Sequence, residues 1–276
     1  MATATSTVER VPARGRSAGI VLPSVSLWQR EVVRFYRQKA RVAGVILSPL
    51  LFWLVIGSGF GTSFRGGAGA QQSHYLDYFY PGALIMIVLF TSIFAMMSVI
   101  EDRKEGFLLS VLAAPISRSV VVLGKVLGGT TLAAAQGIVF LVFLPVIHVY
   151  PGMGAIGLAV VFIFLVSFAL TALGFAIAWP MDSAAAFHGI VNLFMIPLWL
   201  LSGALFPMSG ASGWMVWLMR ANPLTYGVEG LRSVLFPAAP GAMPVGTDLL
   251  VLVAFAAAMF ALCFYMANRR TTKPAA

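Results

Sequence analysis

Few side chains that could carry out proton or ion chemistry lie inside the apolar stretches of this sequence. Lys125 falls near the start of one such stretch and His148 near its end. Asp182 lies in a turn, and His188 lies about one helical turn into the next stretch. Carriers coupled to ions usually place acids or histidines near the membrane midplane, where a mobile cation needs a partner. His188 and Asp182 could form a proton site, with a hydrogen-bonded structural histidine as the alternative.

The residue patterns of catalysis and nucleotide binding are missing from the sequence. We find no Ser/His/Asp grouping, no metal-ligand spacing and no aspartate-rich lipid-transferase motif. Gly124-Lys125 lacks the earlier glycine and the following Ser or Thr of a phosphate-binding loop. The single cysteine, Cys263, cannot form a disulfide within the chain. We therefore expect no catalytic, cofactor-binding or metal-binding residue and no enzymatic activity, so uphill transport would draw its energy from another polypeptide.

The composition places these residues in a bilayer. The chain has 276 residues, of which 60% are hydrophobic and 10% charged, and its mean hydropathy is +0.93. A helix needs about 20 apolar residues to cross the hydrocarbon layer. The sequence predicts an all-α integral membrane protein with six transmembrane helices, at about 42–64, 81–100, 128–150, 155–179, 184–205 and 249–267.

The net charge of +9 indicates orientation in a membrane and contact with anionic lipid, not nucleic acid, because the basic residues lie between the apolar blocks. With the N-terminus inside, only Arg65, Arg220 and Arg232 of the 18 Lys and Arg residues lie outside. Both termini are then cytoplasmic. The composition of residues 1–23 predicts a disordered basic cytoplasmic tail, with a mitochondrial presequence as the alternative. Residues 271–276 are expected to form a second cytoplasmic tail.

Residues 24–41 have the pattern of an amphipathic helix. Trp28, Val32 and Phe35 fall on one face, and basic residues occupy much of the rest. Such a helix is expected to lie in the cytoplasmic interface and lead into the first span. A plain membrane-surface anchor is the alternative.

The cytoplasmic segment 101–118 predicts a second short helix. Glu101, Asp102 and Glu105 precede an apolar stripe formed by Leu108, Val111 and Leu112, and Pro115 ends it. An acidic start and an apolar face suit docking into a groove of a partner protein. The alternative is a loop helix lying on the lipid surface.

The segment 202–232 is apolar enough for membrane depth, but glycines and prolines break it too often for one straight helix. Interrupted backbone is tolerated there only beside protein or a water-filled cavity. We therefore predict a re-entrant helical hairpin beside a pathway. Glu229 and Arg232, three residues apart, are expected to form an ion pair that holds it in register.

Three separated motifs carry a family resemblance, and they lie in the right order on the predicted spans. The first, Tyr75 to Gly82, is an aromatic-Pro-Gly entry to the second span. The second, in the loop after that span, comprises Asp102, Arg103, Gly106, Phe107, Leu108, Leu112, Ala114, Pro115, Ser117, Arg118, Gly124 and Lys125. The third comprises Phe206, Pro207, Trp214, Asn222, Pro223, Leu224, Tyr226, Glu229 and Arg232.

With these motifs the chain resembles the membrane subunits of ABC-2-type ATP-binding-cassette exporters. The likeness is greatest to the drug-exporter-like branch that includes daunorubicin and nodulation-factor export permeases. It covers about residues 24–270, which would form one transmembrane domain. Leu109-Ser110-Val111 departs from relatives that often carry a charge there.

The resemblance implies a permease that works with two copies of a cytosolic ATPase and with a second membrane subunit, identical or paralogous. ATP and magnesium would bind to the ATPase. Residues 24–41 would be the connecting helix. The coupling helix would comprise Glu101, Asp102, Arg103, Glu105, Gly106, Phe107, Leu108, Leu112 and Pro115. The outer gate would comprise Phe206, Pro207, Trp214, Asn222, Pro223, Tyr226, Glu229 and Arg232, with interfacial anchoring as the alternative for the aromatic residues.

The expected function is therefore export of a hydrophobic or amphiphilic substrate, such as a drug, lipid or polyketide, across a bacterial cell membrane. Few fixed charges along the route suit such a substrate better than an inorganic ion. A permease for polysaccharide or lipo-oligosaccharide in the same family is the close alternative. A secondary transporter is the more distant one, and it would require His188 or Asp182.

Overall fold

The computed structural model describes residues 19–37, 39–60, 75–114, 116–236 and 244–269. Over these residues the chain is helical and contains no strand, which confirms the predicted fold class. The predicted tails lie almost wholly outside the described residues. The N-terminal helix begins at Val21, slightly before the predicted position 24.

The first two helices follow one another almost without a break. Helix α1, Val21–Arg37, packs along α6, and α2, Lys39–Phe60, packs against α3. Helix α2 contains Pro49, and its apolar stretch Pro49–Gly59 is shorter than a full span. Residues 61–64 of the predicted first span lie outside the described residues.

The centre of the bundle is the helix pair formed by α3, Tyr75–Ala95, and α4, Met97–Lys104. In the most apolar part of this span 83% of the residues are buried, compared with 22% in α8 and 17% in α11. Helix α3 packs against α2, α6 and α7. Trp53 of α2 donates a hydrogen bond to the Leu76 carbonyl and contacts the rings of Tyr80 and Phe140 in the core.

Helix α5, Phe107–Ala113, follows α4, and α6, Arg118–Phe140, continues into the tighter turns of η2, Leu141–Ile147. Helix α6 therefore begins ten residues before the predicted start at 128. Ser117 caps this helix by accepting a hydrogen bond from the Ser119 amide. Lys125 made the segment too polar to be recognised as part of a span, although its charge is neutralised in the folded chain.

The C-terminal half contains two peripheral spans with a hairpin between them. Helix α7, Met153–Ala178, is followed by α8, Ala184–Trp199, and the wide turn η3, Leu200–Ala204. After η4, Met208–Gly210, come α9, Gly213–Ala221, and α10, Pro223–Leu235, which form the predicted hairpin. Helix α11, Val245–Asn268, closes the bundle against α7 and α10.

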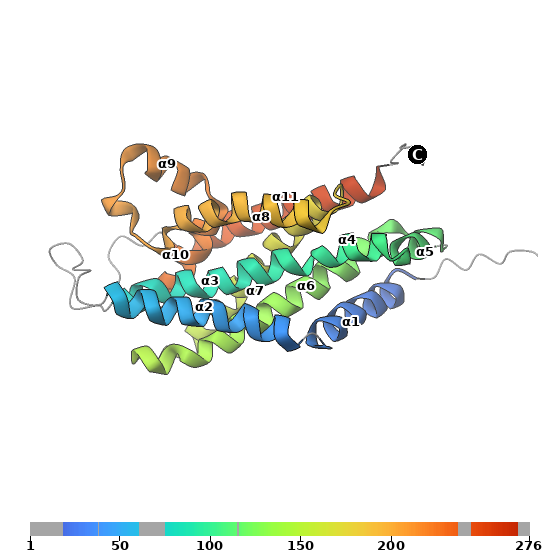
Figure 1. Cartoon of the computed structure of the whole chain (residues 1–276). Coiled ribbons are helices and arrows are strands. Elements are labelled where there is room, and N and C mark those ends of the chain that lie inside the picture. The colour runs from blue at the N-terminus through green and yellow to red at the C-terminus, as the bar shows by residue number, and fades with distance from the viewer. Residues whose placement is uncertain (1–18, 38, 61–74, 115, 237–243, 270–276) are drawn as a thin grey trace, which may run out of the picture.

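Five helical segments among the described residues are long and apolar enough to cross a membrane, namely those starting at Tyr75, Arg118, Met153, Ala184 and Val245. They coincide with five of the six predicted spans, and α2 occupies the place of the remaining one. Figure 1 shows α1, α5 and the end of α11 at one end of the bundle, and α9 at the other. We call the first the α5 end and the second the α9 end.

Candidate functional site

At the α5 end, the turn between α4 and α5 depends on a glycine. Gly106 has a φ of +76°, a left-handed conformation that costs a glycine little. Helix α5 follows this turn and packs against α1 and α6. Glu101 and Asp102 belong to the last turns of α4, and Glu105 caps it. The acidic residues that were expected to begin α5 therefore end the preceding helix.

The apolar face of α5 points into the protein. Leu108 is 3% exposed and lies in a cluster with Leu27 of α1 and Val120 and Val121 of α6. Val111 and Leu112 pack against the same cluster. The stripe predicted to dock into a partner is therefore already used within the chain, because α1 and α6 provide an apolar surface beside it. The exposed residues of α5 are Leu109, Ser110 and Ala113.

The face predicted on α1 also packs inward. Phe35 is 6% exposed, and Val32 is half-buried. The indole Nε1 of Trp28 donates a hydrogen bond of 3.0 Å to Thr131 Oγ1 of α6. This predicted face therefore attaches α1 to the bundle instead of to the lipid.

Beneath these apolar contacts lies a buried cluster of ionic side chains, which joins α1, α4 and α6. Lys125 Nζ lies 2.6 Å from Glu31 Oε1 and also donates to Asp102. It is 1% exposed at the side chain, and Asp102 is fully buried. Lys125 Nζ donates a further hydrogen bond of 3.1 Å to Ser98 Oγ.

Two arginines of α1 complete the neutralisation of Asp102. Arg30 Nη2 lies 2.7 Å from Asp102 Oδ1 and Arg30 Nη1 lies 2.8 Å from Oδ2, which is a bidentate pair. Arg34 donates 2.8 Å bonds to Asp102 and to Glu101. The hydrogen bond to Asp102 raises the pKa of the Arg30 guanidinium above its usual value. The base cluster, as we call Arg30, Glu31, Arg34, Glu101, Asp102 and Lys125, holds three positive and three negative groups.

The base cluster changes the interpretation of two residues. Asp102 was predicted as one of the coupling-helix residues, but it lies inside the protein and is enclosed by cations. Lys125 was counted as a cytoplasmic charge, but it is a buried partner of two acids. Glu31 was not singled out from the sequence. Its spacing from Phe35, one turn along α1, was the only available signal that it faces inward.

A second contact at the α5 end joins α4 to the turn between α7 and α8. Arg103 donates hydrogen bonds to the carbonyls of Trp179 and Met181, and it lies 3.0 Å from Asp182 Oδ1. Asp182 is therefore paired with Arg103. His188 is exposed and its ring centroid lies 5.0 Å from that of Phe94. The structure thus does not bring His188 and Asp182 together as a proton site.

At the α9 end, the predicted pair of Glu229 and Arg232 is present and partly buried. Arg232 also donates a 2.9 Å hydrogen bond to the Gly203 carbonyl, and its guanidinium lies 4.2 Å from the centre of the Tyr78 ring. Tyr78 donates to the same carbonyl at 2.9 Å. Gly203 has a φ of +77°, which turns the chain away from the line of α8. Arg232 and Tyr78 therefore both stabilise the Gly203 carbonyl, which this bend leaves without a helical partner.

The remaining residues of the predicted outer gate differ in burial, because most are buried or half-buried along the hairpin and Trp214 is exposed. Asn222 caps α10 through the Leu224 amide and donates a 2.6 Å bond to the Leu198 carbonyl. Tyr226 bonds to the Arg220 carbonyl at 2.8 Å. Trp214 is 66% exposed on α9. Phe206, Pro207 and Pro223 are half-buried along the hairpin.

One acid near this group was missed from the sequence. Asp248 was left outside the predicted span at 249–267, but α11 begins at Val245 and buries it completely. Neither of its carboxylate oxygens has a hydrogen-bond partner among the described residues. The sequence offered no sign of burial, because an acid in the first turn of a helix is ordinarily a solvated residue.

Comparison with known proteins agrees with this architecture. The ABC-2 type transporter family matches residues 24–236. A putative transport permease ycf38 of Cyanophora paradoxa is 25% identical over 245 residues, which cover 83% of each chain. The daunorubicin resistance ABC transporter permease protein DrrB1 of Streptomyces coeruleorubidus is 26% identical over 247 residues, covering 87% of this chain and 83% of the relative. The family match extends from α1 through α10 and so includes both ends of the bundle described above. The chain therefore belongs to the ABC-2 type transporter family.

Proposed function

We propose that this chain is the membrane subunit of an ATP-driven exporter for a hydrophobic or amphiphilic substrate. The observation that carries the proposal is the arrangement at the α5 end, where a short helix with an exposed outer face is fixed to three helices of the bundle. The similarity to a daunorubicin resistance permease supports an apolar cargo. A separate cytosolic ATPase, present in two copies and loaded with ATP and magnesium, would supply the energy to a pair of membrane subunits.

In this proposal the α5 end faces the cytoplasm. Most of the described Lys and Arg residues lie there, including Arg30, Arg34, Arg103 and Arg118, in keeping with the positive-inside rule. The ATPase would contact Leu109, Ser110 and Ala113, because these side chains are the ones α5 leaves exposed. Glu105, which is also exposed, would lie at the edge of the same contact.

Force applied to α5 would reach the bundle by two routes. Leu108 packs on α1 and α6, and the base cluster ties those helices to α4. The span formed by α3 and α4 has 30 residues, or about 45 Å at 1.5 Å per residue. Its N-terminal end lies beside the bend at Gly203. There Tyr78 of α3 shares the Gly203 carbonyl with Arg232 of α10. A tilt of this span would therefore displace the hairpin.

The test is purification of the chain together with its ATPase, followed by measurement of ATP hydrolysis in nanodiscs. Replacing Leu109 with Glu places a charge on the outer face of α5 without disturbing the inner one. We expect the variant to retain its own fold and to lose the ATPase during purification. Ser209→Glu, at an exposed position of the α9 end, is the matched control. Equal loss from both variants, or an ATPase that never associates, would contradict the proposal.

A second candidate, a carrier driven by an ion gradient, is favoured by one observation. Asp248 is a buried acid in a spanning helix without a hydrogen-bond partner among the described residues, and such groups commonly carry protons in transporters. Proteoliposomes that contain only this chain distinguish the two candidates. Uptake driven by a proton gradient without ATP, and lost in Asp248→Asn, would support the carrier instead of the exporter.

A further inference from the structure

A basic pocket lies on the outer side of the base cluster, between α1 and the end of α4. Its volume is about 440 Å³, and it is lined by Arg30, Val33, Arg34, Arg37 and Glu105. This volume is within the range of small-molecule sites, about 300–1,000 Å³. Three guanidinium groups and one carboxylate line it; Asp102 and Glu101 already neutralise Arg30 and Arg34 from the buried side, so the charge that the pocket offers a ligand is the Arg37 guanidinium. Its chemistry favours an anion.

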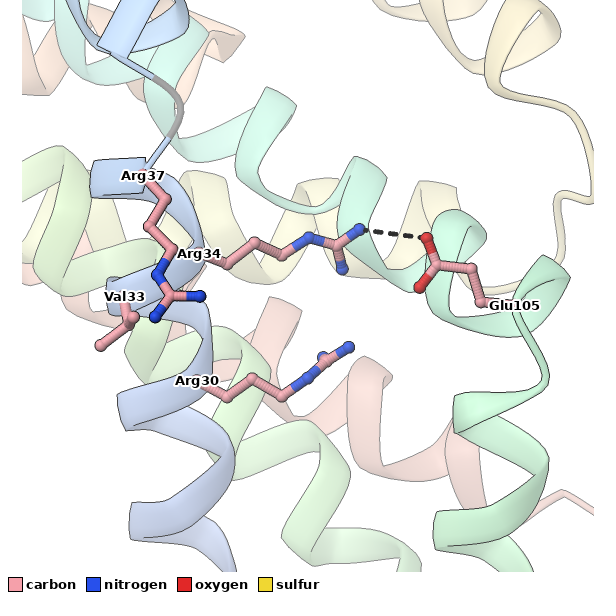
Figure 2. Close-up of a pocket in the computed structure, with 5 residues that line it drawn as sticks. All are labelled: Arg30, Val33, Arg34, Arg37 and Glu105. Carbon is pink, nitrogen blue, oxygen red and sulfur yellow. Dashed lines mark ion pairs between the residues drawn. The ribbon is translucent and has the colours of Figure 1, made fainter.

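The three arginines differ in how they are held. Figure 2 shows Arg30 and Arg34 extending from α1 toward the helix that carries Glu105, while Arg37 folds back along α1. Arg30 and Arg34 are fixed by Asp102 at 2.7 and 2.8 Å. Arg37 is exposed and forms no ion pair with any other described residue. Two of the guanidinium groups are therefore preorganised, and the third is available to a ligand.

The carboxylate in the pocket is weakly engaged. Glu105 Oε1 lies 3.6 Å from Arg34 Nη2, and the Glu105 side chain is 59% exposed. An exposed pair of this kind contributes little, typically about 0–1 kcal/mol. A phosphate group could therefore replace Glu105 beside Arg34 at small cost, and it would form charge-assisted hydrogen bonds with guanidinium groups.

The surface beside the pocket is apolar, which indicates an amphiphile. Val33 lines the pocket and is 42% exposed, and the neighbouring Tyr36 is 55% exposed. Leu22 and Val25 continue this exposed apolar face along α1. The pocket also lies where α1 ends at Arg37 and the first apolar helix begins at Lys39. A free inorganic anion would leave the apolar face unused, whereas a phosphoglyceride would occupy both parts.

We propose that this pocket binds the phosphate-bearing headgroup of an anionic phospholipid from the leaflet at the α5 end. The phosphate would lie among Arg30, Arg34 and Arg37, and the glycerol and upper acyl carbons would contact Val33 and Tyr36. The site lies beside the base cluster and outside the spans. Its lipid would thus be a bound component at the base of α1, whether or not the chain exports anything.

The experiment titrates fluorescent phosphatidylglycerol into the purified full-length chain in detergent, with fluorescent phosphatidylcholine as the neutral comparison. Arg37→Gln removes the free guanidinium and breaks no ion pair among the described residues. We expect it to weaken phosphatidylglycerol binding about fivefold, as one interfacial charge contributes about 1 kcal/mol. Glu105→Gln should have the opposite effect and strengthen binding. Arg269→Gln is the matched control and should leave binding unchanged, because this exposed arginine follows the end of α11 and does not line the pocket.

Several outcomes would overturn the proposal. Equal weakening by Arg37→Gln and Arg269→Gln would show only general attraction to a basic surface. Equal binding of the two lipids would remove the anion requirement. Complete displacement of the lipid by inorganic phosphate at matched concentration would assign the pocket to a free anion. Unchanged lipid binding in Arg37→Gln, together with loss of the copurifying ATPase, would assign it to that protein.

Discussion

At the scale of single residues, the best-defined feature is the buried pairing of Lys125 with Glu31 and Asp102. Each of these side chains is nearly inaccessible, so neither water nor salt can replace a missing partner. Removing one member of a buried ion pair typically costs about 3–5 kcal/mol, because the other charge is left uncompensated. Replacing both members with apolar groups can cost much less.

This leads to a prediction for the base cluster. Lys125→Met leaves three acids facing two arginines, and we expect the free energy of unfolding to fall by about 3–5 kcal/mol. Adding Glu31→Leu restores two charges of each sign and should recover part of the loss. The measurement is the thermal midpoint of the purified chain in nanodiscs. Lys104→Met, at an exposed position, is the control.

If the double variant were no more stable than Lys125→Met, the pairing with Glu31 would not be the source of the effect. A loss as large in Lys104→Met would indicate a general response to reduced charge at the α5 end. Neither result is expected, because Asp102 keeps both arginines in the double variant.

The sequence indicated the importance of this region but not its internal arrangement. Asp102, Gly124 and Lys125 belong to the motif that carried the family resemblance. Nothing in the local pattern separates a buried aspartate from an exposed one, because charged residues are usually solvated. Its burial follows from the approach of α1, which is distant along the chain.

At the scale of elements, close packing between α1 and α6 determines where the charges meet. A Cβ added to Gly124 would lie 2.5 Å from Leu27 Cβ, and one added to Gly128 would lie 2.8 Å from Glu31 Cβ. These two glycines, four residues apart, form a small-residue pair of the kind that lets two helix backbones approach closely. The approach brings Glu31 within reach of Lys125, which lies between the glycines in the sequence.

We therefore predict that Gly128→Leu will force α1 away from α6. Overpacking of this kind typically costs about 1–3 kcal/mol. The variant should also show faster proteolysis between α1 and α2, since α1 would lose its contacts with the bundle. Gly157→Leu on α7, where an added Cβ meets nothing within 4 Å, is the matched control. Wild-type stability and proteolysis in Gly128→Leu would show that α1 does not depend on this contact.

Elements with strong local signals were the easiest to predict. The spans and the hairpin follow from apolar length and from the glycines and prolines that interrupt it. Helix α6 begins ten residues before the span predicted at 128–150, because Arg118 and Lys125 ended the apolar window. The orientation of α5 was also predicted incorrectly, since periodicity identifies an apolar face but not the surface that covers it.

At the scale of the whole molecule, the bundle separates its two candidate working regions. Helix α5 and the base cluster lie at one end, and the hairpin of α9 and α10 begins at the other. Most of the described Lys and Arg residues lie at the α5 end, whereas Arg220 and Arg232 are the described basic residues at the α9 end. This asymmetry predicts which end faces the cytoplasm.

Cysteine labelling tests that orientation directly. Cys263 is fully buried, so the unmodified chain should react little with a membrane-impermeant maleimide. Ala113→Cys on α5 and Ser209→Cys near α9 are both exposed positions. In intact cells we expect labelling of Ser209→Cys alone, and in inside-out vesicles stripped of the ATPase we expect labelling of Ala113→Cys alone. The reverse pattern would invert the topology and place α5 where no cytosolic ATPase can reach it.

The sequence by itself determined the membrane class, the order of most spans, the interrupted hairpin and the pair of Glu229 with Arg232. These properties depend on hydropathy, backbone breakers and spacing within one helix, all of which are local. Only the tertiary structure decided that Asp102, Lys125 and Glu31 meet, that the apolar face of α5 points inward, and that Asp248 is buried. The physical reason is that burial and pairing depend on which helices become neighbours, and Glu31 and Lys125 are 94 positions apart in the chain.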